Sequence, residues 1–220
     1  MNDAPPRRVL VTGADGFVGR ALCRALAARG REVLAVTRSP ATIPGAARVL
    51  PVGDLVQFHD WAPLLEGVEG VAHLAALTHD GTRGANSARF TAVNVEVSRR
   101  LAQSARASGV AHFVYLSSIK AAGERSPPGR ALSGDNMPAP EDDYGRSKLA
   151  AERAVGEIWR DGALIVLRPP LVYGAGQRGN LARLCAHLER GLPLPCASPP
   201  NRRSLVQVDN LADALVLALD

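Results

Sequence analysis

The chain has 220 residues, of which 26 are basic and 21 acidic, so its formal net charge is +5. A hydrophobic fraction of 46% indicates a globular protein that can bury a core, which excludes a disordered, collagen-like or coiled-coil chain. No apolar run approaches the roughly 18 residues that a membrane helix needs, and the polar first eight residues are unlike a signal peptide, so no membrane association is expected. Three scattered cysteines favour a reducing compartment, and we expect a cytoplasmic protein.

The basic excess reflects arginine usage more than a nucleic-acid surface. Only Lys120 and Lys148 are lysines, and the basic residues are spread along the whole chain. Aromatic residues make up 4% of the sequence, which leaves few platforms on which bases could stack. We therefore expect no nucleic-acid partner, whereas small phosphate-bearing ligands fit a modest positive charge.

Short apolar runs alternate with longer amphipathic ones along the chain. The pattern predicts strands over residues 9–12, 32–36, 49–52, 71–75, 113–117, 164–167 and 205–208. It predicts helices over residues 17–29, 58–65, 87–108, 143–159, 180–190 and 209–219, with Gly30 and Gly109 as stop signals. Residues 121–142 are rich in Gly, Pro, Ser and charge, and are expected to form a long loop.

This alternation predicts an α/β fold, a doubly wound parallel sheet with helices on both faces. Continuous apolar strands such as residues 164–167 agree, because parallel strands are buried on both sides. Such a sheet binds its ligand at the carboxyl ends of its strands, so the residues at those ends are the candidates for function.

The first candidate is a glycine-rich turn after the first strand. Gly13, Gly16 and Gly19 are three apart and open the first helix, a spacing that allows a tight turn, close approach to a pyrophosphate and close helix–strand packing. The pyrophosphate would lie on the free N–H groups of the helix N-terminus. A glycine triplet alone could be only a tight turn, but its position favours a dinucleotide. No Gly-Lys-Ser/Thr follows, which disfavours a P-loop.

The end of the second strand bears on the cofactor's ribose. An NAD site usually has Asp or Glu there, whereas this chain has Thr37-Arg38-Ser39. Arg38 could accept a 2′-phosphate, which favours NADP over NAD; the alternative is a surface arginine. Asp54 and Leu55, after the third strand, could hold the adenine edge, or Asp54 could cap the following helix.

A second candidate lies at the start of the predicted helix 143–159. Tyr144 and Lys148 are four apart and share a helix face. An ammonium near a phenol favours the phenolate, so we expect a lowered pKa for Tyr144 and a role in general acid/base catalysis. Ser117 and Ser118 end the fifth strand on the same carboxyl edge. The Ser118 hydroxyl could bond the reacting oxygen, or it could be a strand-end cap.

With these residues the chain resembles an extended short-chain dehydrogenase/reductase of the NAD(P)-dependent nucleotide-sugar epimerase/dehydratase family. The resemblance runs in family order over essentially the whole chain and implies a Rossmann-type fold. The matching segments are VTGADGFVG from Val11, VAHLAA from Val71, VNVE from Val93, YLSS from Tyr115, YGRSK from Tyr144, LRPPLVYG from Leu167 and RRSLVQVDNLADA from Arg202.

The resemblance implies the roles of the site residues. Ser118, Tyr144 and Lys148 would be catalytic, with Lys148 also on the nicotinamide ribose, and Asn94 would support the site. The cofactor would contact Gly13, Gly16, Phe17, Val18, Gly19, Asp54, Leu55, Ala75, Ala76, Tyr144, Lys148, Pro170 and Val172, and Arg38 as argued above. Ser118, Asn180 and Arg203 would bind the substrate, a nucleotide-diphosphate sugar.

The implied chemistry is hydride transfer between the nicotinamide and a sugar C4, with Tyr144 exchanging the hydroxyl proton. Ile119-Lys120 follows Ser118 where dehydratases of the family often carry Asp-Glu, which argues against dehydration. The residues from 118 to 124 and from 201 to 206 are most similar to enzymes that reduce or epimerise UDP-linked 4-keto-6-deoxy-N-acetylhexosamines for polysaccharide synthesis.

The expected organisation is a Rossmann core over residues 1–168, then residues 169–220 with the last core elements and part of a small C-terminal substrate lobe. Family members usually continue for about a hundred residues more, so the chain is expected to be truncated there. The resemblance also implies a homodimer formed through helices 87–108 and 143–159. A catalytically weak NAD(P)-binding sensor or scaffold of the same fold stays open as the alternative.

Other catalytic classes find little support in the sequence. The five histidines show no paired spacing and no cysteine pair matches a zinc site, so no metal is expected. A serine hydrolase is disfavoured because no Gly-x-Ser-x-Gly motif is present.

Overall fold

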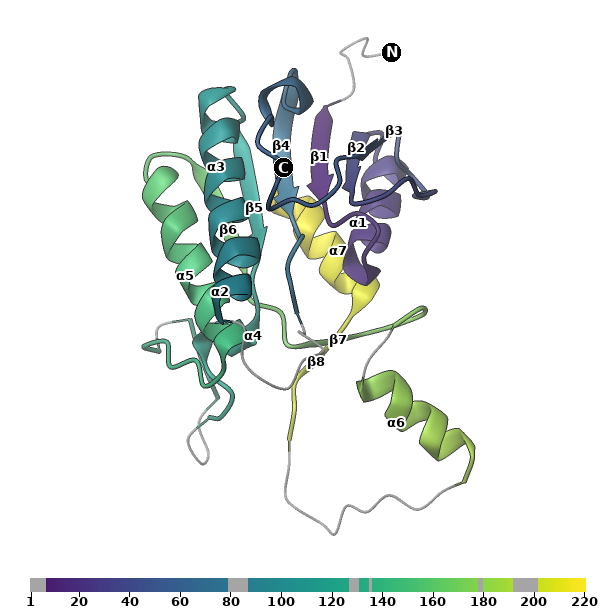
Figure 1. The fold of residues 1–220 in the computed structure, drawn as a ribbon. Helices are drawn as coiled ribbons and strands as arrows, with labels where there is room; N and C mark the ends of the chain where they lie inside the picture. The colour runs from purple at the N-terminus through teal and green to yellow at the C-terminus, as the bar shows by residue number, and fades with distance from the viewer. Residues whose placement is uncertain (1–6, 79–86, 127–130, 135, 178–179, 192–201) are drawn as a thin grey trace.

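The computed structural model describes residues 7–78, 87–126, 131–134, 136–177, 180–191 and 202–220. Its centre is a six-stranded parallel sheet of order β3-β2-β1-β4-β5-β6 (Figure 1). The strands are β1 (Arg8–Thr12), β2 (Glu32–Thr37), β3 (Arg48–Pro51), β4 (Val68–His73), β5 (His112–Leu116) and β6 (Ala163–Leu167). This is the strand order of a doubly wound dinucleotide-binding sheet, so the predicted parallel α/β fold is confirmed.

Helices cover both faces of the sheet, as Figure 1 shows. α1 (Phe17–Ala28) and α7 (Val208–Leu217) pack together on one face, and α3 (Val97–Ala107) and α5 (Asp143–Ile158) lie on the other. Successive side chains of β1 therefore enter two cores. Leu10 packs in the core that contains Trp159 of the α5 end, whereas Val9 and Val11 pack with Leu22 of α1. Burial on both faces explains the continuous apolar strands.

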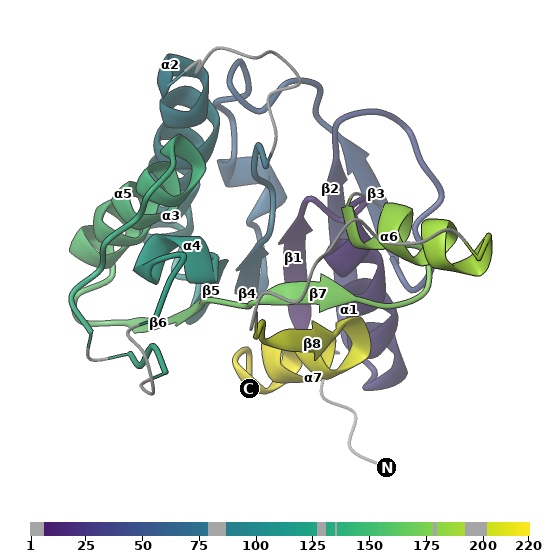
Figure 2. The same ribbon diagram turned by 90° about the horizontal axis from the view of Figure 1, so that it is seen from below.

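A second, two-stranded sheet crosses below the carboxyl ends of the central strands (Figure 2). It pairs β7 (Leu171–Tyr173) with β8 (Leu205–Gln207) in parallel, and α6 (Asn180–Glu189) lies beside it. The predicted strand at 205–208 thus exists but joins this small sheet. β7 is absent from the prediction, because three residues after a Pro-Pro pair carry too little pattern.

Three predicted elements differ from the structure. The expected helix 58–65 is only a 3-10 turn, Ala62–Leu64. Pro63 would lie in the interior of the expected helix, where it has no N–H to donate, but it is tolerated in the first turn of the 3-10 segment. The expected helix 87–108 is divided into α2 (Ser87–Phe90), a π-helical segment (Thr91–Glu96) and α3. The expected loop 121–142 is preceded by a short helix, α4 (Ile119–Ala122), which extends into its first two residues.

Candidate active site

The glycine-rich turn joins β1 to the N-terminus of α1 and also contacts the residues that follow β4. Gly13 has φ of 66°, and a Cβ there would lie 2.8 Å from the Ala75 nitrogen. A Cβ on Gly19 would lie 2.1 Å from the Gly13 carbonyl oxygen, so the helix packs against the turn too closely for any side chain. Gly16 is the N-cap residue of α1, whose first turn contains no acidic side chain. This cradle of backbone N–H groups fits a cofactor diphosphate.

The hydrophobic residues beside the cradle come from two segments far apart in the sequence, α1 and β7. Phe17, Val18 and Val172 pack against one buried cluster, formed by α1 and α7. The structure thus brings Val172 of β7 to the start of α1, as its expected place in a cofactor site requires. Pro170 precedes it and is partly buried.

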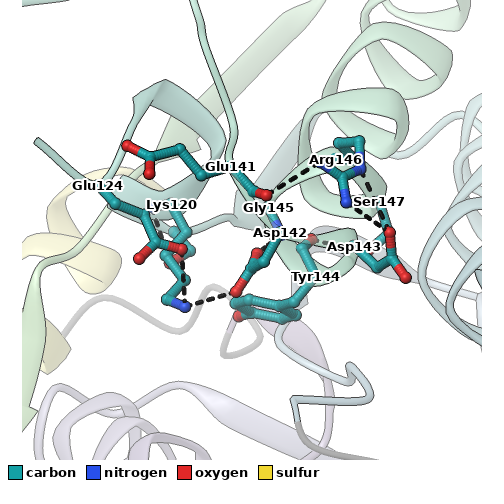
Figure 3. Close-up of polar contacts among 10 residues, drawn as sticks. Lys120, Glu124, Glu141, Asp142, Asp143, Tyr144, Gly145, Arg146 and Ser147 are labelled. Atoms are coloured by element: carbon teal, nitrogen blue, oxygen red, sulfur yellow. Dashed lines mark hydrogen bonds and ion pairs between the residues drawn. The ribbon is translucent and has the colours of Figure 1, made fainter. Parts of the chain in front are cut away.

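Ser118 and Tyr144 meet at the carboxyl end of β5. Ser118 is the N-cap residue of α4, and its Oγ accepts a hydrogen bond from the Lys120 N–H at 3.2 Å. Ser118 is therefore a capping serine, as the expected alternative has it, and the same hydroxyl is also close enough to the Tyr144 phenol to lower its pKa. Tyr144 stands in the first turn of α5, close to Lys120 and Asp142 (Figure 3).

The pKa of Tyr144 differs in direction from our expectation. Burial raises this pKa above its ordinary value, and Asp142 raises it further, whereas Ser118 and Lys120 lower it. The cation that acts on the phenol is thus Lys120 of α4. Near neutral pH the phenol is protonated.

Lys148 follows Tyr144 by one turn of α5 and is buried. Its ammonium donates to the Leu116 carbonyl oxygen at 2.6 Å and lies 4.2 Å from the centre of the Tyr115 ring. Only 1% of the residue is exposed, and this burial lowers its pKa to about 7, although Glu152 opposes the shift. Lys148 is therefore poised between its charged and neutral forms near physiological pH.

A buried charge cluster supports this lysine and was absent from the sequence-based prediction. Glu152, one turn after Lys148, accepts a hydrogen bond from the Ser117 hydroxyl and two from Arg168, at 2.9 and 2.5 Å. The cluster joins α5 to the ends of β5 and β6. The signal available in the sequence was the i, i+4, i+8 spacing of Tyr144, Lys148 and Glu152 on one helix face.

Asn94, which the resemblance implied as a support of the site, links two segments beside it. Its side chain exchanges two hydrogen bonds with the backbone of Leu77, at 2.8 and 3.0 Å, and donates to the Ser147 hydroxyl at 2.9 Å. Ser147 in turn donates to the Tyr144 carbonyl oxygen at 2.8 Å. The π-helical segment that carries Asn94 thereby ties the Ala75-Ala76 loop to the first turn of α5.

His73 is a second residue that the sequence analysis missed. Its Nε2 lies 2.8 Å from the Ser98 hydroxyl, whose own proton goes to the Asn94 carbonyl oxygen at 2.6 Å. Nε2 therefore carries the proton, and Nδ1 accepts from the Thr12 hydroxyl at 2.6 Å. Thr12 also accepts from the Ala75 N–H at 3.2 Å. Desolvation by burial, followed by the charge of Lys148, lowers the pKa of His73 to about 3.

The other expected site residues occupy more exposed positions. Arg38 is exposed just after β2, and Asp54 is exposed with its Oδ1 accepting from the Val56 N–H at 2.9 Å. Asp54 therefore caps a turn and not the expected helix. Leu55 is partly buried, Arg203 is exposed before β8, and Asn180 begins α6, with its side chain outside the described part of the chain.

Two negative findings concern the described residues. Within the ranges given above, no group of His, Cys, Asp and Glu side chains is placed to hold a metal ion. Over the same part of the chain, no helix has the length and apolar character to cross a membrane.

Comparison with known proteins gives a consistent result. The model of the NAD dependent epimerase/dehydratase family matches residues 9–220. A UDP-glucose 4-epimerase of Vibrio cholerae is 34% identical over 98% of this chain and 67% of its own length. A 2-alkyl-3-oxoalkanoate reductase of Stenotrophomonas maltophilia is 31% identical over 97% of this chain, which spans 65% of that protein.

Solved structures agree with the sequence relatives. The structure of MoeE5 in complex with UDP-glucose and NAD has a TM-score of 0.82 and 33% identity, and covers 97% of this chain and 72% of its own. The family match, the relatives and the glycine cradle agree on a nicotinamide cofactor. The chain belongs to the NAD dependent epimerase/dehydratase family, among the extended short-chain dehydrogenases/reductases.

Proposed function

We propose that the protein transfers hydride between NAD(P) and the sugar C4 of a nucleotide-diphosphate hexose, as a C4 epimerase or reductase. The observation that carries the proposal is that the Ser118 hydroxyl lies close to the Tyr144 phenol at the carboxyl edge of the sheet, the edge that also carries the glycine cradle. The similar UDP-glucose 4-epimerase, and MoeE5 with UDP-glucose and NAD, support a UDP-hexose as substrate.

The residues divide the chemistry among them. Bound nicotinamide would supply the hydride donor or acceptor. Tyr144, protonated near neutral pH, would give its proton to a sugar carbonyl oxygen and take it back in the reverse direction, while Ser118 orients that oxygen. Lys148, anchored on the Leu116 carbonyl, would bind the nicotinamide ribose. Asn180 and Arg203 would hold the substrate diphosphate, in a lobe that begins after residue 168.

A panel of nucleotide sugars tests the substrate class. We expect the full-length protein with bound cofactor to convert at least one UDP-hexose into its C4 epimer or C4-reduced product, detected by chromatography and NMR. UDP-glucose, UDP-glucuronic acid and a UDP-linked 4-keto-6-deoxy-N-acetylhexosamine are compared with GDP- and dTDP-hexoses. Cofactor binding without turnover of any nucleotide sugar would contradict the proposal and favour the sensor or scaffold function.

The cofactor preference depends on Arg38. A charge-assisted bond from this guanidinium to a 2′-phosphate should make NADPH bind roughly tenfold more tightly than NADH, and Arg38→Ala should remove the difference. Titration by nicotinamide fluorescence measures both affinities, with Arg24→Ala, an exposed arginine of α1, as the matched control. Equal affinities in the unmodified protein, or tighter NADH binding, would rule out the 2′-phosphate role.

A further inference from the structure

The two hydroxyl groups of the site stand at the starts of two different helices. Ser118 caps α4, and Tyr144 lies in the first turn of α5, which Asp142 caps by accepting the Gly145 N–H at 2.7 Å. Their separation therefore depends on how α4 is fastened to the start of α5.

An ion pair and a backbone contact fasten these two helix starts (Figure 3). The Lys120 ammonium lies 2.5 Å from Asp142 Oδ2 and 3.1 Å from Glu124 Oε1. A Cβ on Gly145 would lie 2.4 Å from the Lys120 carbonyl oxygen, so the α4 backbone rests directly against the first turn of α5. Asp142 thus serves both helices: one oxygen caps α5 and the other holds Lys120.

We propose that the Lys120–Asp142 ion pair sets the distance between the Ser118 hydroxyl and the Tyr144 phenol, which makes Lys120 a positioning residue of the active site. The catalytic meaning of this inference rests on the proposed function. Lys120 acts through the two hydroxyl groups and needs no contact with the substrate. Its neighbour Ser118 follows every movement of α4, because Ser118 Oγ is bonded to the Lys120 N–H.

The two charges of the pair also act on the phenol in opposite senses. Lys120 lowers the pKa of Tyr144 and Asp142 raises it. Tyr115 also interacts electrostatically with the phenol, Lys148 follows it by one turn of α5, and the α2 side of Tyr144 presents the Phe90 ring. Glu124 acts on Lys120, to which it is bonded. Loss of one partner should therefore shift the titration of the phenol in a direction that depends on which partner is removed.

Kinetics of three variants test the positioning role. We expect Lys120→Met and Asp142→Asn each to lower kcat by roughly tenfold with unchanged cofactor Kd, because a misplaced reacting group costs rate and not cofactor affinity. Asn keeps the capping acceptor for the Gly145 N–H, so α5 should still start normally. The double variant should be no slower than either single one, and Lys120→Arg should recover most of kcat. Arg29→Met is the matched control, since its 3.0 Å pair with Asp213 also joins two helices, α1 and α7, but touches neither α4 nor α5.

Titration of tyrosine separates this inference from the proposed function, because it needs no turnover. The chain has three tyrosines, so ¹³Cζ-labelled tyrosine gives three signals, and Tyr144→Phe assigns one of them. Above about pH 9, we expect Tyr144 to titrate earlier in Asp142→Asn and later in Lys120→Met than in the unmodified protein. The proposal is overturned if the two variants shift the signal in the same direction or not at all, or if an active enzyme keeps its kcat in both.

Discussion

Tyr144→Phe is expected to lower kcat by about a thousandfold, since a positioned acid/base contributes roughly 10²–10⁴-fold. The change removes the hydroxyl that lies close to Ser118 and leaves the aromatic ring, which packs near Phe90, in place. The cofactor cradle is formed by other segments, so the Kd for NAD(P) should change little. Single-turnover measurements of nicotinamide absorbance follow the hydride step directly.

Tyr173→Phe is the matched control for this experiment. Tyr173 ends β7 and is exposed, so the loss of its hydroxyl should leave kcat within about twofold of the unmodified protein. Unchanged turnover in Tyr144→Phe would remove Tyr144 from the mechanism, even if the protein proved to be a nucleotide-sugar enzyme.

The sheet was predictable because its physical causes are local. Each central strand is a run of apolar residues buried on both faces. Glycines such as Gly13 after β1 and Gly30 after α1 mark where the chain turns. Gly30, with φ of 72°, ends α1 as predicted, because only glycine adopts that conformation without strain. The short elements were not predicted, because a strand of three residues such as β7, or a helix of four such as α4, is too short to show a hydrophobic periodicity.

The interior of the site was less predictable, because it is formed by pairs far apart in the chain. Thr12 and His73 come from two strands, and Ser117 and Glu152 from a strand and a helix. Nothing local marks His73 as a hydrogen-bonded core residue. The π-helical segment at Asn94 is likewise not visible in the apolar pattern, which fits a continuous helix. Within this segment, the Asn94 side chain bonds to the distant Leu77 backbone.

The expectation for Tyr144 failed for an electrostatic reason. Spacing alone places an ammonium near a phenol, but it says nothing of the desolvation that both groups undergo. In the structure burial raises the pKa of Tyr144 and lowers that of Lys148 to about 7, so the neutral form of each group is favoured. Sequence spacing thus identified the partners but not the direction of the effect.

His73 should make the fold sensitive to acid. Its pKa is lowered from the ordinary 6.5 to about 3 in the folded protein, so between these values the unfolded chain binds more protons. The free energy of unfolding therefore falls as pH drops through 6.5, by an amount on the order of 4 kcal/mol at pH 3. Protonation of Nδ1 would also turn the acceptor of the Thr12 hydroxyl into a donor and leave the Thr12 proton without its present acceptor.

His73→Gln isolates this contribution. An amide can still donate to Ser98 and accept from Thr12 but does not titrate, so the variant should be less stable than the unmodified protein at pH 7 and lose stability less steeply between about pH 6.5 and 4. Urea unfolding at a series of pH values measures the two slopes, and His59→Gln, which changes an exposed histidine, should retain the unmodified slope. If the stability of His73→Gln and of the unmodified protein fell equally steeply with pH, His73 would be protonated in the folded protein without cost. That result would contradict the prediction, which rests on the complete burial of His73 and on the fixed direction of its two hydrogen bonds.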